Sequence, residues 1–232
     1  MTFMNTIQDP NFEEPQSNFS MPMVVEQDGN GYRSYDLPSR MMESRILMLD
    51  RDFNSQMAHI MKQQLLYLDS LNADPITIYI NSPGGSVHDG LGIADVVGNL
   101  RSPIRTVVVG MAASMGCYMQ STMGTPGMRF MGKRSQIMAH QVSSGTQGLI
   151  LDQKIALEHS LNLNKLLTEE IAEAVGMPIE QFLKDCDRDM WLNAEEALNY
   201  GTKGFVDGVY LGKQDANGKQ LVLRRGGVEE WV

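Results

Sequence analysis

The chain has 232 residues, 42% of them hydrophobic and 20% charged, with a formal net charge of −9. This size suits one large domain with a sizeable core. The acidic balance leaves no basic patch to neutralise phosphates, which argues against nucleic-acid binding, and no apolar run approaches the roughly 20 residues that a membrane-spanning helix needs.

The chain contains only two cysteines, Cys117 and Cys186. They form neither a CxxC pair nor the cysteine–histidine spacing of a zinc site, so we expect no metal. Their low number fits a reducing compartment. The first basic residue is Arg33, so the N-terminus lacks the positive charge that opens a secretory signal peptide. We therefore expect a cytoplasmic protein.

The N-terminal third begins with a polar segment. Residues 1–20 show little hydrophobic periodicity, and we expect a disordered leader there. The turn signal Gly29-Asn30-Gly31 predicts two short extended segments within 21–36. The apolar run 46–49 predicts a strand, and apolar residues at helical spacing predict a helix over 54–71.

The middle of the chain alternates between strand and helix patterns. A buried strand over 76–80 breaks at residues 81–85, and a helix over 86–100 follows. A strand over 106–109 leads into a helix through about residue 123, and 124–132 is expected to be a loop. A short strand over 135–139 ends at His140. Such alternation predicts βαβ crossovers and a mostly parallel sheet in an α/β fold.

The last third begins with a long amphipathic helix over 150–175. Shorter helices over 178–187 and 193–200 and a strand over 205–211 follow. A polar turn, the apolar run 221–223 and a ragged end complete the chain. We expect residues 21–211 to form the folded domain and residues 212–232 to form a C-terminal extension.

Ser114 stands in the segment 110–116, GMAASMG, directly after the β-branched run 106–109. This pattern predicts a sharp strand-to-helix turn that holds the Ser114 hydroxyl beside free backbone N–H groups. A nucleophile with an oxyanion hole requires that arrangement. The alternative is a tightly packed turn in which the small residues only permit close approach.

Two other residues are candidates to act with Ser114. His140 follows a predicted strand, at the strand end where α/β enzymes place reactive groups. Asp189 lies in the carboxylate-rich run 185–189 and need only reach the far nitrogen of His140. A structural histidine and a solvated loop are the alternatives. His88 competes as the base, although we expect it on a helix face.

Two glycine-containing segments bear on ligand binding. The pair Gly84-Gly85 follows a buried strand, where it either brings backbone N–H groups close to a ligand oxygen or forms a simple turn. The segment 127–133, GMRFMGK, matches most of a phosphate-binding loop. However, Arg134 stands where Ser or Thr would contact magnesium, so we expect no nucleotide site.

The order Ser…His…Asp differs from that of α/β-hydrolases, chymotrypsin and subtilisin, and the serine motif lacks GxSxG spacing. Five segments instead closely resemble the proteolytic subunit of the ATP-dependent Clp protease, a serine peptidase family (S14). They are 81–87 (NSPGGSV), 110–116 (GMAASMG), 138–141 (MAHQ), 187–189 (DRD) and 194–201 (AEEALNYG). The resemblance covers roughly residues 22–210.

This resemblance implies a crotonase-like spiral of ββα units with a protruding handle helix. It implies that Ser114 is the nucleophile, that His140 is the general base and that Asp189 orients His140. Backbone N–H groups of Gly84 and Met115 would form the oxyanion hole. The implied reaction is hydrolysis of peptide bonds in unfolded proteins through an acyl-enzyme.

The resemblance also implies a homo-oligomer of two stacked seven-membered rings, a tetradecamer, and a separate AAA+ ATPase that unfolds substrates and threads them in. ATP would be used by that partner, so this subunit needs no cofactor. Asp187 and Arg188 match a pair that couples the rings, and Tyr79 matches a position near the ATPase docking pocket. The leader 1–20 and the tail 212–232 have no clear counterpart in the family pattern, and the leader is either a disordered segment or a propeptide that is removed. The location implied is the cytoplasm, with the plastid stroma as an alternative.

The chain departs from the family pattern outside the triad. After His140-Gln141 the family usually continues Pro-Leu-Gly-Gly, whereas residues 142–145 read VSSG here. Leu149 replaces a usually polar residue of the handle. These departures concern the substrate groove and the ring contact.

Three alternatives stay open. The first is a non-proteolytic scaffold subunit of a Clp-type ring, although such relatives usually lose triad residues. The second is an acyl-CoA enzyme of the crotonase type, which would not need all three of Ser114, His140 and Asp189. The third is a phage-type head-maturation protease with the same chemistry and no ATPase partner.

Overall fold

The computed structural model describes residues 22–29 and 31–232, and it divides into two compact units, residues 1–40 and 41–232. The predicted leader 1–20 lies outside the described residues. Each unit is considered by itself. No helix in the described ranges is long and apolar enough to cross a membrane.

The first unit contains the two extended segments that the sequence predicts. Strands β1 (Met23–Asp28) and β2 (Gly31–Asp36) pair antiparallel. Helix α1 (Leu37–Glu43) begins in this unit, and the sequence analysis missed it. The Asp36 carboxylate accepts hydrogen bonds from the backbone N–H and the hydroxyl of Ser39, both at 2.8 Å, and so caps the first turn.

The second unit is built on a mostly parallel sheet, as predicted. Its central strands lie in the order β9-β6-β5-β4-β3, and all of these neighbours pair in parallel. Their bounds are β3 (Ile46–Leu49), β4 (Ile76–Ser82), β5 (Ile104–Ala113), β6 (Arg129–Gly132) and β9 (Gly208–Gln214). Strands β10 (Gln220–Leu223) and β11 (Glu229–Trp231) extend the β9 edge in antiparallel pairing.

Strand β5 pairs with β4 on one side and with two different strands in succession on the other. Residues 106–108 pair with β6, whereas residues 111–113 pair with β7 (Gln136–Ala139). Gly110, with φ of 90°, lies between the two halves, and a Cβ added there would come 2.5 Å from Asn81 Oδ1. The predicted strand 106–109 was therefore too short, because Gly110 bends the strand without ending it.

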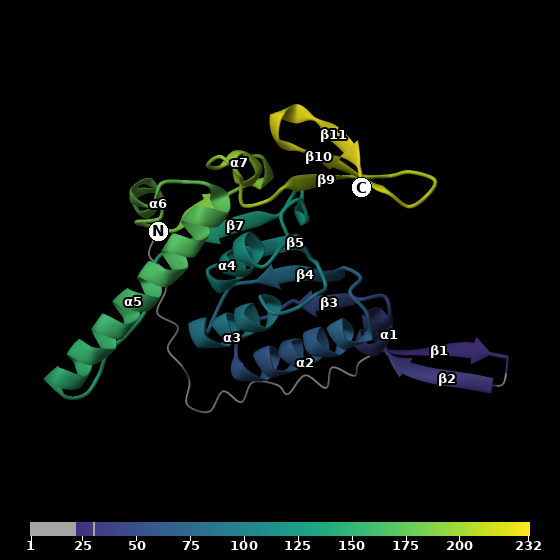
Figure 1. Cartoon of the computed structure of the whole chain (residues 1–232), viewed down its shortest axis with the longest axis horizontal. Helices are drawn as coiled ribbons and strands as arrows, with labels where there is room; N and C mark the ends of the chain where they lie inside the picture. The colour runs from purple at the N-terminus through teal and green to yellow at the C-terminus, as the bar shows by residue number, and fades with distance from the viewer. Residues whose placement is uncertain (1–21, 30) are drawn as a thin grey trace, which may run out of the picture. The chain divides into compact units, whose positions relative to one another are not determined.

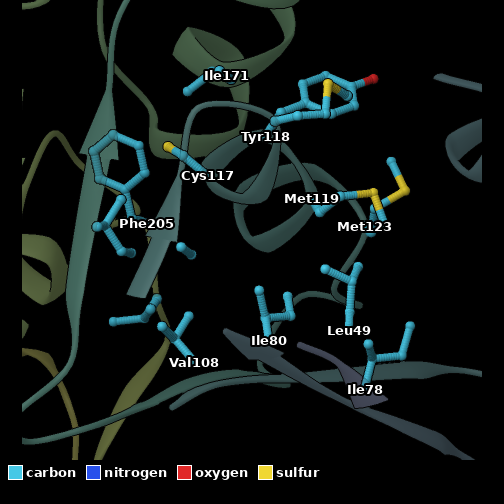
Figure 2. Packing of buried hydrophobic residues seen from close by; sticks show 14 of the residues in the cluster. Leu49, Ile78, Ile80, Val108, Cys117, Tyr118, Met119, Met123, Ile171 and Phe205 are labelled. Carbon is cyan, nitrogen blue, oxygen red and sulfur yellow. The ribbon is translucent and has the colours of Figure 1, made fainter. Parts of the chain in front are cut away.

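Helices α2 (Ser55–Leu71), α3 (Val87–Val97) and α4 (Met115–Thr122) follow β3, β4 and β5, as Figure 1 shows. The Asn54 side chain accepts a hydrogen bond from the N–H of Met57 and starts α2. Helix α4 is short but almost wholly buried, and it packs on β4, β5 and β7. In Figure 2 its residue Met119 lies on the side of the sheet residues Leu49, Ile78 and Ile80, whereas Cys117 lies beside Phe205. The apolar patterns of the sequence thus form one main core, with a smaller separate cluster of Val107, Phe130 and Val222.

Helix α5 (Ile150–Val175) confirms the predicted long helix and has two unlike halves. Its C-terminal half buries Leu167, Ile171 and Val175, and Gly176 ends it in the left-handed region with φ of 68°. The N-terminal half extends away from the sheet in Figure 1. That half exposes large apolar side chains, among them Ile150, Leu151, Ile155 and Leu161.

The rest of the chain completes the sheet edges. Helices α6 (Ile179–Asp185) and α7 (Ala194–Asn199) match the two predicted short helices. Between them, β8 (Met190–Leu192) pairs antiparallel with β7. This three-residue strand was missed, because it is too short to show a period.

Three other predictions were wrong in detail. The expected loop 124–132 contains β6, whose Phe130 and Met131 are buried although glycines flank the segment. The strand predicted over 205–211 begins only at Gly208. The end of the chain is not ragged, because β11 pairs with β10. For β6 and β11 the tertiary pairing outweighed the local turn signals.

A buried ion pair joins β6 to the segment before β9. The Arg129 guanidinium donates to the Asp207 carboxylate from Nε at 3.0 Å and from Nη2 at 2.7 Å. The two side chains are only 7% and 15% exposed. The same carboxylate accepts the backbone N–H of Gly127 and of Arg129. Removing one partner would therefore leave a buried charge and several donors unsatisfied.

We predict that Asp207→Ala lowers the free energy of unfolding by about 3–5 kcal/mol, because the Arg129 charge stays buried without its partner. Glu158→Ala serves as the control. It removes an exposed pair with Lys154 and should change stability by less than about 1 kcal/mol. Urea unfolding followed by circular dichroism measures both values. Equal losses in the two variants would contradict the assigned role of the buried pair.

Candidate active site

Ser114 occupies the turn between β5 and α4. Its backbone has φ of 54° and ψ of −117°, an uncommon region for a residue other than glycine. Its N–H donates to the Met138 carbonyl at 2.9 Å, which fixes the turn against β7. The sequence predicted a sharp strand-to-helix turn at this position, and the structure confirms it. The strained backbone holds the hydroxyl at the carboxyl edge of the sheet.

The three predicted triad residues lie together. His140 Nε2 is 2.7 Å from Ser114 Oγ, a hydrogen-bond distance at which the ring can take the hydroxyl proton. His140 Nδ1 lies 3.4 Å from Asp189 Oδ1. The Asp189 side chain is 62% exposed in the single chain, whereas that of His140 is 26% exposed. This arrangement can activate Ser114 as a nucleophile and stabilise an imidazolium.

Gly84 lies against the Ser114 side chain. A Cβ added at Gly84 would come 2.5 Å from Ser114 Cβ and 2.9 Å from the Ala113 carbonyl oxygen. The φ of Gly84 is 100°, which also favours glycine. Only glycine therefore lets the loop after β4 approach the serine turn this closely.

The two backbone N–H groups expected in an oxyanion hole differ in their present partners. Met115 is the first residue of α4, where a backbone N–H has no acceptor within the helix. The N–H of Gly84 donates to Ser82 Oγ at 3.2 Å. This long hydrogen bond would have to open before Gly84 could stabilise an oxyanion. The sequence analysis did not foresee the Ser82 hydroxyl as a competitor.

A pocket of about 240 Å³ opens beside Ser114. Its wall is largely apolar and comes from α4, α5, α6 and the segment after His140. The apolar and aromatic lining residues are Val87, Met115, Tyr118, Val142, Leu167, Ile171 and Phe182. This wall can receive an apolar side chain of a bound molecule.

Asn164 of α5 holds the segment after His140 in place. Its Oδ1 accepts the backbone N–H of Val142 at 2.8 Å. Val142 stands where the family usually has proline, and proline could not donate this hydrogen bond. The sequence analysis missed Asn164. The replacement of proline by Val142 was the available signal, because it adds a backbone N–H that needs an acceptor.

A second polar contact ties the pocket to α5. The Tyr118 hydroxyl donates to Glu170 Oε2, and this contact joins α4 to α5. Burial raises the pKa of Tyr118 above its usual range, and the neighbouring Glu170 carboxylate adds to the rise. Tyr118 therefore stays a neutral donor.

The two cysteines carry free, buried thiols. Burial raises the pKa of Cys117 to about 12 and also raises the pKa of Cys186.

The other predicted site residues lie in an exposed segment, in the strand β4 inside the sheet and in helix α3. Asp187 and Arg188 border an open pocket with His140, and their side chains form an exposed pair at 3.6 Å. Tyr79 packs in a small cluster with Phe130, Tyr210 and Val222. His88 lies in α3, on a helix as expected, and its recorded partner is His159 and not Ser114.

The structure bears on two kinds of ligand that the sequence raised. Residues 129–132 of the phosphate-loop-like segment form strand β6, so the backbone there pairs with β5 and β9. Within residues 22–29 and 31–232, no three His, Cys, Asp or Glu side chains gather closely enough to hold a metal.

Comparison with known proteins gives consistent matches. The Clp protease family model matches residues 28–212. An ATP-dependent Clp protease proteolytic subunit of Ligilactobacillus salivarius (strain UCC118) is 40% identical over 195 residues, covering 84% of this chain and 97% of the relative. The subunit of the same name from Streptococcus thermophilus (strain ATCC BAA-491 / LMD-9) is 42% identical over 197 residues, covering 84% and 98%. That of Streptococcus pyogenes serotype M5 (strain Manfredo) is 43% identical over 190 residues, covering 81% and 95%.

We predict that a fluorophosphonate probe labels Ser114 and that Gly84→Ala slows labelling by about 10²-fold or more, because the new Cβ displaces both the serine and an oxyanion donor. Peptide mass spectrometry locates the label and measures its rate. Gly145→Ala is the control, since a Cβ there meets no atom within 4 Å. Labelling of Gly84→Ala at the wild-type rate would contradict the assigned contact.

Proposed function

Because the chain belongs to the Clp protease family and is a serine-type endopeptidase subunit of that protease, we propose that Ser114, His140 and Asp189 form its catalytic triad. The observation that carries this proposal is the 2.7 Å distance between Ser114 Oγ and His140 Nε2. The strained Ser114 backbone supports it, because such strain concentrates at catalytic residues.

The proposed reaction begins when Ser114 Oγ attacks the carbonyl carbon of a peptide bond while His140 Nε2 takes the hydroxyl proton. The negative charge that develops on the carbonyl oxygen is stabilised by the N–H groups of Gly84 and Met115. Asp189 stabilises the imidazolium and keeps the Nδ1 proton directed toward itself. His140 then protonates the leaving amine, and the acyl-enzyme remains.

Hydrolysis of the acyl-enzyme repeats these roles. His140 takes a proton from water, the water oxygen attacks the ester carbon, and the second tetrahedral intermediate collapses to the carboxylic acid. Ser114 Oγ regains its proton from His140. Every proton passes through one imidazole, so no metal or organic cofactor enters the proposed cycle.

The finer description of the fold is also a proposal. We propose a crotonase-like spiral of ββα units in which α5 is the protruding handle helix. Two observations support it. Strand β5 pairs with β6 along one half and with β7 along the other, which turns the sheet. The N-terminal half of α5 carries exposed apolar residues, as a helix does that is covered in an assembly. We propose residues 21–211 as the protease domain and 212–232 as an extension, with 1–20, which lies outside the described residues, as a leader or propeptide.

We propose an assembly of two stacked seven-membered rings that works with a separate AAA+ ATPase. The relatives are named as subunits of an ATP-dependent protease. In this chain residues 129–132 of the phosphate-loop-like segment form strand β6. We therefore assign the use of ATP to the partner. The substrates would be unfolded proteins, in cytoplasmic protein quality control or in a plastid stroma. Asp187 and Arg188 would contact the opposite ring beside His140.

The apolar pocket beside Ser114 supports a preference for apolar side chains immediately before the cleaved bond. Leu167, Ile171 and Phe182 line this pocket. Burial of an apolar substrate side chain against them would contribute about 1.5–3 kcal/mol to binding.

The placement of all three triad residues favours this protease over a scaffold subunit and over an acyl-CoA enzyme, neither of which needs them together.

Ser114→Ala should lower peptide cleavage by about 10⁶-fold, since no nucleophile remains. Asp189→Asn should keep the fold and lower cleavage by about 10⁴-fold, because the ring loses its orienting acceptor. Turnover of a fluorogenic peptide measures both variants against wild type. Cleavage by the Ser114→Ala protein at the wild-type rate would refute the triad.

Asn164→Ala should raise KM about tenfold for a peptide with an apolar side chain, with a smaller change in kcat. The reason is that the segment after His140 borders the pocket and loses the acceptor for the Val142 N–H. Asn162→Ala, a change at an exposed position of the same helix, is the control. A selective loss of kcat in Asn164→Ala would show that Asn164 acts on the triad instead.

A further inference from the structure

Two histidines outside the proposed triad face each other. His88 lies in the first turn of α3, and His159 lies in α5, 71 residues later in the chain. Their Nε2 atoms are 3.4 Å apart, whereas the ring centroids are 5.5 Å apart and the planes differ by 16°. The two rings therefore converge at their Nε2 atoms.

We propose that His88 and His159 form a binding site for a divalent transition metal, with Zn²⁺ as the preferred ion. Zinc binds imidazole nitrogen at about 2.0–2.1 Å in tetrahedral geometry, so two such ligands stand about 3.3–3.4 Å apart. The observed separation matches this value. It is long for a direct N–H···N hydrogen bond, which is typically about 2.9–3.0 Å.

The surroundings suit a site of two protein ligands completed by solvent. Both histidines are exposed in the single chain, so water can fill the other two positions of a tetrahedral ion there. No third ligand gathers with them among the residues that the structure describes. The two cysteines do not compete for zinc, because both are buried. Imidazole selects zinc, copper or nickel over magnesium.

The position of the pair links the metal to the active site. His88 directly follows Val87, which lines the pocket beside Ser114, and comes four residues after Gly84. His159 precedes Asn164 on α5 by little more than one turn. An ion held by both rings would therefore fasten the start of α3, which directly follows the loop that carries Gly84, to the helix that forms the pocket wall. The bound ion would stabilise the arrangement of α3 and α5 that the structure shows.

Isothermal titration of the assembled full-length protein with Zn²⁺ tests this proposal. Wild type should bind one ion per chain that depends on the His88–His159 pair, and Mg²⁺ should give no heat. His88→Ala and His159→Ala should each weaken binding about tenfold or more, since each removes one of two ligands. His59→Ala is the control, because His59 is another exposed helical histidine and should leave the affinity unchanged. His140 stays intact in all three variants, so zinc bound at the active site cancels in the comparison.

A thermal unfolding measurement provides an independent readout. Zn²⁺ should raise the unfolding temperature of wild type and of His59→Ala, and it should raise that of His88→Ala and His159→Ala less. Both pair variants alter exposed side chains, and their unfolding temperatures without metal show that they fold. Unchanged zinc affinity in both pair variants would overturn the proposal. A stoichiometry of one pair-dependent ion per two chains would also overturn it, because the ion would then bridge separate chains.

Discussion

The close contact between Gly84 and Ser114 is the constraint on which the rest of the site depends. It brings the loop after β4 against the turn after β5, and a single Cβ at position 84 would overlap the serine side chain. The sheet supplies the framework, because β4 and β5 are parallel neighbours whose carboxyl ends meet at one edge. The strain at Ser114 is tolerated because β7 fixes the Ser114 N–H and α4 is buried directly after it.

The bend at Gly110 determines where His140 lies. If β5 paired with one neighbour along its whole length, β6 would occupy the position that β7 takes beside Ser114. Because the strand bends, its second half pairs with β7, and His140 leaves β7 at the level of the serine turn. The Asn81 side chain supports the bend by accepting the N–H of Met111. Asn81, a residue of the motif 81–87, thus helps to set which part of β5 pairs with β7.

Much of this arrangement follows from the sequence, and the remainder depends on contacts that no local pattern encodes. The short runs 46–49 and 76–80, rich in apolar and β-branched residues, predicted β3 and β4, as is typical of strands in a parallel sheet. Ser114 and His140 were selected by residue type and by position after strands, Asp189 came from a carboxylate-rich run, and the family resemblance joined the three into a triad. The second pairing of β5, the strand β6 between glycines and the role of Asn164 in holding Val142 all arise from partners distant in sequence. The hydrogen bond from the Gly84 N–H to the Ser82 hydroxyl could not be predicted either, because only the folded loop brings the two groups together.

The burial of both thiols has a practical consequence for spectroscopy. Cys117 and Cys186 are the only cysteines of the chain, both lie in the core, and the high thiol pKa of Cys117 keeps its reactive thiolate scarce. Maleimide dyes or spin labels should therefore leave the native chain unmodified. A single cysteine introduced at an exposed position, such as Leu161 of α5, would carry the only label. Distances between such labels would then report on α5 without any need to remove the native cysteines.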